Sequence, residues 1–254
     1  PDNSLAHRTT WLRSDFILVH GDTTTTLAGG MAAFYNQVKI GHVEAGLRTW
    51  NIRSPFPEEA NRQMVDCITD FYFAPTQKSK ENLLKEGKDE SKIFVTGNSA
   101  IDALKTTISK DYKNEIFNWL GEDKLILLTA HRRENLGEPM RHMFRAIRRV
   151  LDENEGYKVI YPVHLNPLVR QVADEVFEND NKIKLIEPLE VIDFHNFLNR
   201  AHIILTDSGG IQEEAPSLGK PVLVLRDTTE RPEGIEAGTL KLATTNEEKI
   251  YTLL

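Results

Sequence analysis

The chain has 254 residues, which is enough for one large or two modest domains with their own cores. Its formal net charge of −7 argues against a nucleic-acid-binding surface. No stretch approaches the roughly 20 apolar residues that span a membrane. The single cysteine, Cys67, excludes an internal disulfide and fits a reducing compartment, so we expect a cytoplasmic protein.

The first half of the chain alternates short apolar runs with longer mixed segments, a pattern typical of βα units. Strands are predicted at residues 16–19, within 38–43, at 71–74 and at 92–96. Helices are predicted from Thr23 to about 37, from Glu58 to about 69, and from an N-cap at Thr76 to a stop at Gly87.

Acidic residues stand at the carboxyl ends of the first two predicted strands. Asp22 follows the first strand and Glu44 the second, the position at which open α/β sheets bind ligands. Two alternatives stay open: Asp22 could only cap the following helix, and Arg48 or Arg53 could neutralise Glu44.

The second half of the chain repeats the alternation after a connecting segment. We predict an N-terminal domain over 1–105, a linker over 106–121 and a C-terminal domain over 122–254. Predicted strands lie at 125–129, 158–163, 182–186, 203–207 and 221–225, and predicted helices at 137–154, 167–178, 190–201 and 211–218. This order predicts a doubly wound parallel sheet.

The segment that begins at residue 203 has the strongest binding signature. Its apolar strand runs into the turn Ser208-Gly209-Gly210, where glycines let an anion approach free N–H groups at a helix start. Glu214, one turn into that helix, can accept hydrogen bonds from ribose hydroxyls. The alternative is an ordinary β–α turn, because a lone SGG is weak evidence.

A second polar loop follows the strand 125–129. His131 stands there beside Arg132 and Arg133, whose charges would depress its pKa. An imidazole so placed can assist a leaving diphosphate while the arginines bind its oxygens. The alternative is a solvated surface loop.

Four long motifs resemble one enzyme family: HGDTTTT from His20, GHVEAGLRTWNIRSPFPEEANR from Gly41, TAHRRENLG from Thr129 and DSGGIQEEAPSLGKPVLVLRDTTERPE from Asp207. In these motifs and in their order, the chain resembles the non-hydrolysing UDP-N-acetylglucosamine 2-epimerases. The resemblance implies an α/β fold of two Rossmann-like domains of glycosyltransferase-B type. It also implies further chain before residue 1 and after residue 254, so we expect the first domain to be truncated.

The resemblance carries roles to individual positions. Asp22, Glu44, Glu58 and His131 match its catalytic residues. Arg132 and Glu134 match a regulatory substrate site of some members. The matching UDP-binding positions are Phe194, Ser208, Gly209, Gly210, Glu214 and Arg231.

The implied reaction is the reversible conversion of UDP-N-acetylglucosamine to UDP-N-acetylmannosamine, by elimination of UDP to a 2-acetamidoglucal and its re-addition. It requires no metal or redox cofactor, and the resemblance further implies a homodimer that supplies cell-envelope polysaccharide precursors. Three alternatives remain: a hydrolysing 2-epimerase, a sugar transferase of the same fold, and a non-catalytic nucleotide-sugar-binding fragment.

Overall fold

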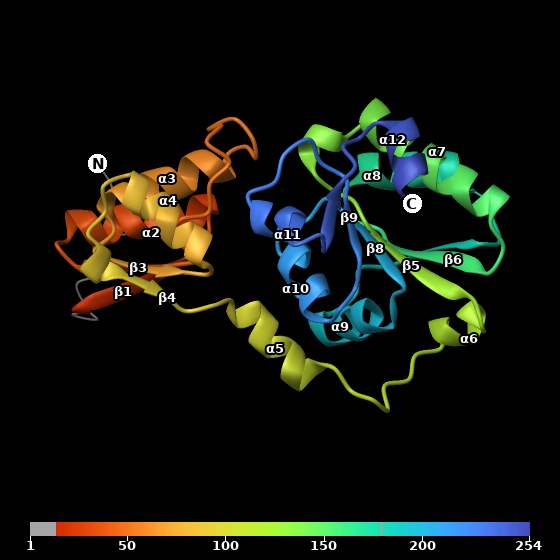
Figure 1. Cartoon of the computed structure of the whole chain (residues 1–254), viewed down its shortest axis with the longest axis horizontal. Coiled ribbons are helices and arrows are strands. Elements are labelled where there is room, and N and C mark those ends of the chain that lie inside the picture. The colour runs from red at the N-terminus through yellow and green to blue at the C-terminus, as the bar shows by residue number, and fades with distance from the viewer. Residues whose placement is uncertain (1–13, 179) are drawn as a thin grey trace. The chain divides into compact units, whose positions relative to one another are not determined.

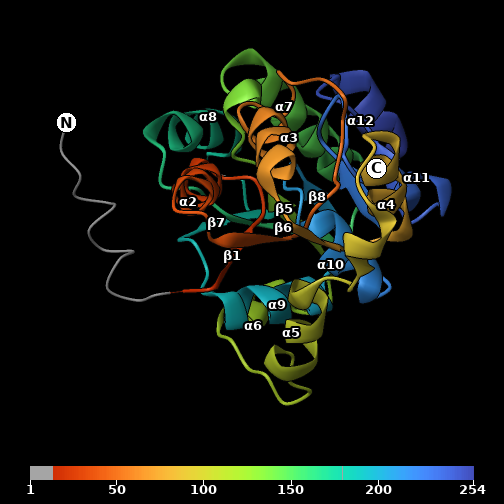
Figure 2. The ribbon, with the colours of Figure 1, turned by 90° about the vertical axis from the view of Figure 1, so that its left-hand side faces the viewer.

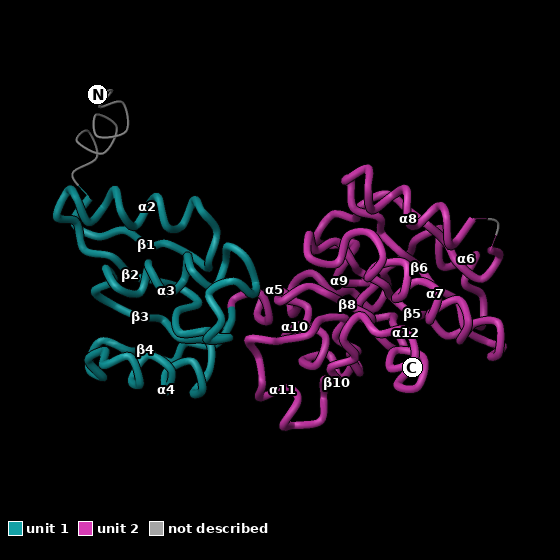
Figure 3. The backbone as a smooth tube through the Cα atoms, turned by 90° about the horizontal axis from the view of Figure 1, so that it is seen from above, with its two compact units in different colours: residues 1–98 teal, residues 99–254 magenta. Residues whose placement is uncertain are grey.

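The structure, a computed structural model, describes residues 14–178 and 180–254. The chain forms two compact units, the first ending at Asn98 and the second running from Ser99 to Leu254 (Figure 3). This division precedes residue 105, the predicted end of the first domain. The reason is that α5 (Ser99–Thr107) packs on α9 (Val191–Arg200) and α10 (Ile211–Ser217) of the second unit.

The first unit contains a four-stranded parallel sheet in the order β1-β2-β3-β4. Every strand predicted in this half is present, with ends shifted by a residue or two. The elements in chain order are β1 (Phe16–His20), α2 (Thr24–Tyr35), β2 (Lys39–Val43), α3 (Glu58–Ile68), β3 (Phe71–Ala74), α4 (Gln77–Lys85), a short 3-10 helix (Glu90–Lys92) and β4 (Ile93–Val95).

The sequential strand order places the helices of this unit on one face of its sheet. Crossovers between parallel strands are right-handed as a rule, so a sheet built in strict order receives all its helices on the same side. Figure 1 shows α2, α3 and α4 there. On the other face, Phe16, Leu18 and Phe94 keep 40%, 59% and 46% of their surface exposed.

The second unit contains a six-stranded parallel sheet in the order β10-β9-β8-β5-β6-β7, with helices on both faces (Figures 1 and 2). β5, β6 and β7 follow one another toward one edge of the sheet. The chain then returns to the middle, and β8, β9 and β10 follow one another toward the other edge. Its further elements are α6 (Ile116–Leu120), β5 (Lys124–Thr129), α7 (Glu138–Glu153), β6 (Tyr157–Pro162), α8 (Pro167–Phe177), β7 (Ile183–Ile186), β8 (Ile203–Thr206), β9 (Val222–Val224), α11 (Pro232–Glu236), β10 (Leu240–Leu242) and α12 (Glu247–Leu253).

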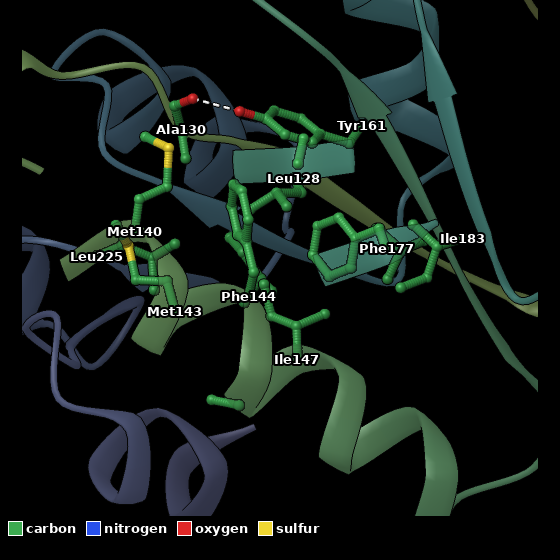
Figure 4. Packing of buried hydrophobic residues seen from close by; sticks show 14 of the residues in the cluster. Leu128, Ala130, Met140, Met143, Phe144, Ile147, Tyr161, Phe177, Ile183 and Leu225 are labelled. Atoms are coloured by element: carbon green, nitrogen blue, oxygen red, sulfur yellow. Dashed lines mark hydrogen bonds between the residues drawn. The ribbon is translucent and has the colours of Figure 1, made fainter. Parts of the chain in front are cut away.

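The core of the second unit explains why its strands read as continuous apolar runs. Side chains alternate across a strand, and both faces of this sheet are buried. Ile126 and Leu128 of β5 join the cluster under α7 and α8, whereas Leu125 and Leu127 join the cluster under α9. Figure 4 shows the first cluster, in which the ring centroid of Phe144 lies 4.7 Å from that of Phe177.

These observations confirm the predicted fold class, an α/β chain with two parallel sheets. Among the residues that the structure describes, no helix is both long and apolar enough to cross a membrane.

Candidate functional site

The polar loops of the second unit meet where its strand order reverses. β5 and β8 are neighbours, with Thr129 opposite Thr206 and their hydroxyls 2.7 Å apart. The loop of His131 leaves the first of these strand ends, and the turn of Ser208 leaves the second. Open α/β sheets bind ligands in the crevice at such a switch point. The fold therefore brings together two groups of residues that lie about 75 positions apart in sequence.

Asp207, which the sequence analysis did not single out, ties the two loops together. Its side chain is completely buried, and Oδ2 accepts the backbone N–H groups of His131 and Arg132, each at 2.9 Å. The same oxygen accepts Asn135 Nδ2 at 3.0 Å, and the Asp207 carbonyl accepts Arg132 Nε at 3.0 Å. The sequence held one signal for the role of Asp207, which is an acidic residue directly after a predicted buried strand.

His131 lies in this junction with its side chain 42% exposed. Its ring stacks on that of His164, with centroids 5.4 Å apart and planes 10° from parallel. Burial lowers the pKa of His131, and the charges of His164 and Arg132 lower it further, against the raising effect of Asp207. The lowered pKa favours the neutral form of the ring. Arg132 Nη1 lies 3.6 Å from Glu134 Oε1, so the two predicted regulatory residues are adjacent.

The two glycines of the Ser208 turn, Gly209 and Gly210, differ in how much room their surroundings leave for a side chain. A Cβ on Gly209 would lie 2.7 Å from Glu230 Oε1 and 2.9 Å from Arg231 Nη1, so this position has no room for a side chain. Gly210 has helical backbone angles, and a Cβ there would lie 3.5 Å from Glu214 Oε1, an ordinary contact. Packing alone therefore requires Gly209, whereas packing leaves room for a side chain at Gly210.

Arg231 is buried behind this turn instead of standing open toward it. Its Nη1 donates to Glu230 Oε1 at 2.6 Å, and its Nε donates to Glu213. Arg226 Nη1 donates to the other oxygen of Glu230 at 3.0 Å. The guanidinium of Arg231 thus shapes the wall behind Gly209, and its predicted contact with UDP stays a prediction.

Glu214 and Phe194 come from neighbouring helices, α10 and α9. Glu214 Oε2 lies 3.8 Å from Nε2 of His195, the residue after Phe194. His195 is fixed in turn, because its Nδ1 lies 2.7 Å from Thr107 Oγ1. Burial raises the pKa of Glu214, with Glu213 adding to the rise and Arg231 opposing it. Phe194 is half-buried against the core cluster under α9.

In the first unit, Asp22 is bound to α3 and does not cap α2. The N-cap of α2 is Thr23, whose hydroxyl accepts the N–H of Thr26 at 3.2 Å, so the capping alternative for Asp22 is wrong. The Asp22 carboxylate pairs with Arg62, and its carbonyl accepts Asn61 Nδ2 at 2.8 Å. Asn61 and Arg62 lie on α3 about one helical turn after Glu58.

Glu44 directly follows β2 in the left-handed region, with φ of +69°. Its Oε2 lies 3.6 Å from His20 Nε2, and a Cβ on Gly21 would lie 3.3 Å from the same oxygen. Arg48 does not neutralise it, because that guanidinium donates to Asp66 at 2.6 Å and to Glu86 at 2.6 Å. Glu44 therefore lies beside the loop that carries Asp22.

The adjacent glutamates of α3 have different surroundings. Glu59 is fully buried and accepts the backbone N–H groups of Thr49 and Trp50, each at 3.1 Å, which fixes the preceding loop. Glu58 has one buried carboxylate oxygen, Oε2, without a hydrogen-bond partner among the described residues. Of the two, Glu58 is the one with capacity for a further contact.

A buried charge cluster lies beneath these carboxylates. His42 Nδ1 lies 2.6 Å from Asp66 Oδ1, and its Nε2 donates to the Gly21 carbonyl at 2.8 Å. Burial lowers the pKa of His42, but the hydrogen bond and charge of Asp66 outweigh it, so the pKa is raised. The hydrogen bond from His42 to the Gly21 carbonyl fixes the turn before Asp22. The sequence analysis did not predict this cluster.

Comparisons with known proteins agree in one assignment. The family model described as UDP-N-acetylglucosamine 2-epimerase matches residues 3–254. A UDP-N-acetylglucosamine 2-epimerase of Bacillus subtilis is 66% identical over 242 residues, which cover 95% of this chain and 64% of that protein. The enzyme of that name from Neisseria meningitidis is 48% identical over 94% of this chain and 66% of its own length.

Solved structures agree with the sequence comparisons. A putative UDP-N-acetylglucosamine 2-epimerase from Listeria monocytogenes matches 99% of this chain and 66% of its own, with a TM-score of 0.95 and 58% identity. The Neisseria meningitidis enzyme bound to UDP-GlcNAc matches 99% of this chain and 70% of its own, with a TM-score of 0.92 and 46% identity. The chain thus spans about two thirds of the length of these relatives, and less of the Bacillus subtilis protein.

Proposed function

The chain belongs to the UDP-N-acetylglucosamine 2-epimerase family, and from that premise we propose the reaction of the whole protein. It interconverts UDP-N-acetylglucosamine and UDP-N-acetylmannosamine by eliminating UDP to a 2-acetamidoglucal and adding it back with the opposite configuration at C2. We propose further that the enzyme does not hydrolyse its substrate to the free sugar and that it forms a homodimer. In this proposal it lies in the cytoplasm and supplies precursors of cell-envelope polysaccharides.

The observation that carries the proposal is the junction of two loops at the switch point of the second sheet. Asp207 holds the His131 loop against the Ser208 turn, so polar groups from two strand ends converge where α/β sheets bind nucleotides. UDP would bind there, with Gly210 main chain near phosphate and Glu214 on the ribose. Relatives from Neisseria meningitidis and Methanocaldococcus jannaschii were solved with UDP-GlcNAc, the second also with UDP.

The carboxylates of the first unit supply the proton chemistry in this proposal. The proton on C2 is weakly acidic, so its removal needs help from departing UDP. Epimerisation must also take a proton from one face of C2 and return it to the other, which favours two acids over one. We assign proton exchange to Glu44 and Glu58, a positioning or shared role to Asp22, and assistance of UDP departure to His131.

The test is product analysis in deuterium oxide. The chain is incubated with UDP-N-acetylglucosamine, and NMR identifies the products and the isotope at C2. UDP-N-acetylmannosamine carrying deuterium at C2 is the expected result. Free N-acetylmannosamine with UDP would instead indicate a hydrolysing enzyme, and UDP release that depends on an added acceptor would indicate a transferase.

Glu44→Gln tests the base assignment, because it removes the charge with little change of volume. Exchange and epimerisation should fall by at least the factor of about 100 to 10,000 typical of general acid–base groups. UDP affinity should stay within a few-fold of wild type. Glu81→Gln, on the exposed side of α4, is the matched control and should change neither quantity. Ordinary deuterium exchange in Glu44→Gln would remove Glu44 from the proton transfer.

A second candidate is a non-catalytic nucleotide-sugar-binding fragment. Among the described residues, the second unit has six strands with helices on both faces, whereas the first has four strands with helices on one. The chain also covers only 64% of its Bacillus subtilis relative. UDP binding by calorimetry without any product would support this candidate over the enzyme.

Regulation is a separate part of the proposal. Arg132 and Glu134, which lie 3.6 Å apart at the switch point, would bind a second substrate molecule that activates the enzyme. Arg132→Ala should then make the dependence of rate on substrate concentration less sigmoidal. A sigmoidal curve unchanged by this substitution would remove Arg132 from a regulatory site.

A further inference from the structure

We propose that Asp207 is a positioning residue for His131, which it holds with the ring proton on Nδ1 so that Nε2 is the nitrogen that exchanges protons. The inference rests on the proposed function for its chemical meaning. The tautomer itself is a property of the protein without substrate.

The first argument is the unequal state of the two Asp207 oxygens. Oδ2 is saturated by three N–H donors, two from the backbone and one from Asn135. Oδ1 is buried and has no hydrogen-bond partner among the described residues. A buried acceptor without a donor is destabilising by about 1–3 kcal/mol. His131 Nδ1 lies 3.5 Å from this oxygen, so it is the donor within reach.

The second argument is that the ring of His131 has few other orientations. Its backbone N–H donates to the same carboxylate that its ring approaches, which fixes the start of the side chain. The ring also stacks on His164 at 5.4 Å. Turning the ring over would place a carbon in front of Asp207 Oδ1 and leave that oxygen without a donor. At 3.5 Å this contact is longer than a hydrogen bond, as catalytic contacts commonly are in a protein without bound ligand.

The chemical consequence follows from the imidazole itself. An ionised carboxylate only accepts hydrogen bonds, so Nδ1 must carry a proton to satisfy it. The neutral ring then has its lone pair on Nε2. When the ring binds a second proton and becomes an imidazolium, Nε2 donates to an oxygen of the departing diphosphate. Without the proton, it accepts one when UDP adds back. In both forms Asp207 stabilises the charge that appears on the ring, as an aspartate does for histidine in hydrolytic triads.

The tautomer can be read directly by long-range ¹H–¹⁵N correlation spectra of the ¹⁵N-labelled chain, taken above the pKa of His131. His131→Gln identifies the signals by their loss from among the 8 histidines. Wild type should show the protonated nitrogen at Nδ1, the form that free imidazole disfavours. Asp207→Asn should convert it to the Nε2–H form, because the amide oxygen keeps the three donors and turns its NH₂ toward Nδ1.

The control is Asp123→Asn, which removes the carboxylate that pairs with Lys158 at 3.0 Å on the same unit. It should leave the His131 tautomer unchanged. Wild-type His131 in the Nε2–H form would overturn the proposal, and so would an Nδ1–H form that persists in folded Asp207→Asn. If Asp207→Asn does not fold, the wild-type spectrum still decides.

Activity provides the distinguishing readout. If the chain is active, Asp207→Asn and His131→Asn should each slow glycal formation by about 100- to 10,000-fold, since both remove the same proton exchange. A chain that forms no product but shows the Nδ1–H form would contradict the proposed reaction and leave the role of Asp207 intact. Full activity in Asp207→Asn would overturn that role and leave the reaction standing.

Discussion

Gly209→Ala tests whether packing, not ligand binding, is the reason for the first glycine of the turn. The added methyl would lie 2.7 Å from Glu230 Oε1 and 2.9 Å from Arg231 Nη1, closer than carbon atoms approach such groups. Both partners are buried, with 4% and 5% of their surface exposed, so neither can swing into water. Overpacking of this kind costs about 1–3 kcal/mol. Separating the buried ion pair would raise the cost to about 3–5 kcal/mol.

Gly210→Ala is the matched control, because its methyl would lie 3.5 Å from the nearest atom and its backbone is already helical. Its free energy of unfolding should stay within about 1 kcal/mol of wild type, since alanine loses less backbone entropy on folding than glycine does. If the main chain of Gly210 binds a phosphate of UDP, Gly210→Ala should weaken UDP binding without unfolding the second unit.

The assay is urea unfolding followed by Trp119, which packs against the core cluster of the second unit. Replacing Trp11 and Trp50 by Phe leaves Trp119 as the sole tryptophan of the 3 in the chain. The transition then reports on the second unit alone. An unfolding free energy of Gly209→Ala within about 0.5 kcal/mol of wild type would refute the packing argument, because overpacking should cost more.

Three further predictions concern the core, the buried histidine and the ribose contact. Phe144→Ala should lower the unfolding free energy of the second unit by about 3–5 kcal/mol in the same assay, because the ring is completely buried between α7 and the sheet. The raised pKa of His42 means that its contribution to stability is complete below its ordinary value and is lost as pH rises through the raised value. The urea midpoint of the first unit, followed by Trp50 in a chain with Trp11 and Trp119 replaced by Phe, should therefore fall on the alkaline side and stay flat when His42→Gln is added. Glu214→Ala should weaken UDP binding by about 1–3 kcal/mol in calorimetry, and unchanged affinity would remove Glu214 from the ribose.

The sequence predicted the strands well because each is a short apolar run that ends in a polar turn. Leu125 to Thr129 and Ile203 to Thr206 are buried on both faces, so their patterns are continuous and easy to recognise. The elements that were not predicted have little internal signal. α5 buries only Leu104, α11 has five residues, and β10 has three, so contacts with the rest of the fold determine them.

The candidate site shows the same limit at the level of side chains. Motifs indicated His131, Glu44 and Glu58, but no motif gives the partner of a residue. Asp66 meets His42 across 24 positions and Arg48 across 18, and only the packing of α3 on β2 brings the three together. For the same reason the sequence left open whether Arg48 neutralises Glu44, a question decided by where Asp66 lies.

The exposed apolar side chains of the first sheet, Phe16, Leu18 and Phe94, have a consequence for the solution behaviour of the polypeptide. Amphiphilic dyes, hydrophobic resins and chaperones all recognise contiguous apolar surface regardless of its detailed shape. Added salt screens the net charge of −7 that keeps copies apart, and sulfate strengthens apolar association in addition. Apolar association through this face would therefore strengthen with added salt, whatever the state of either group of candidate residues.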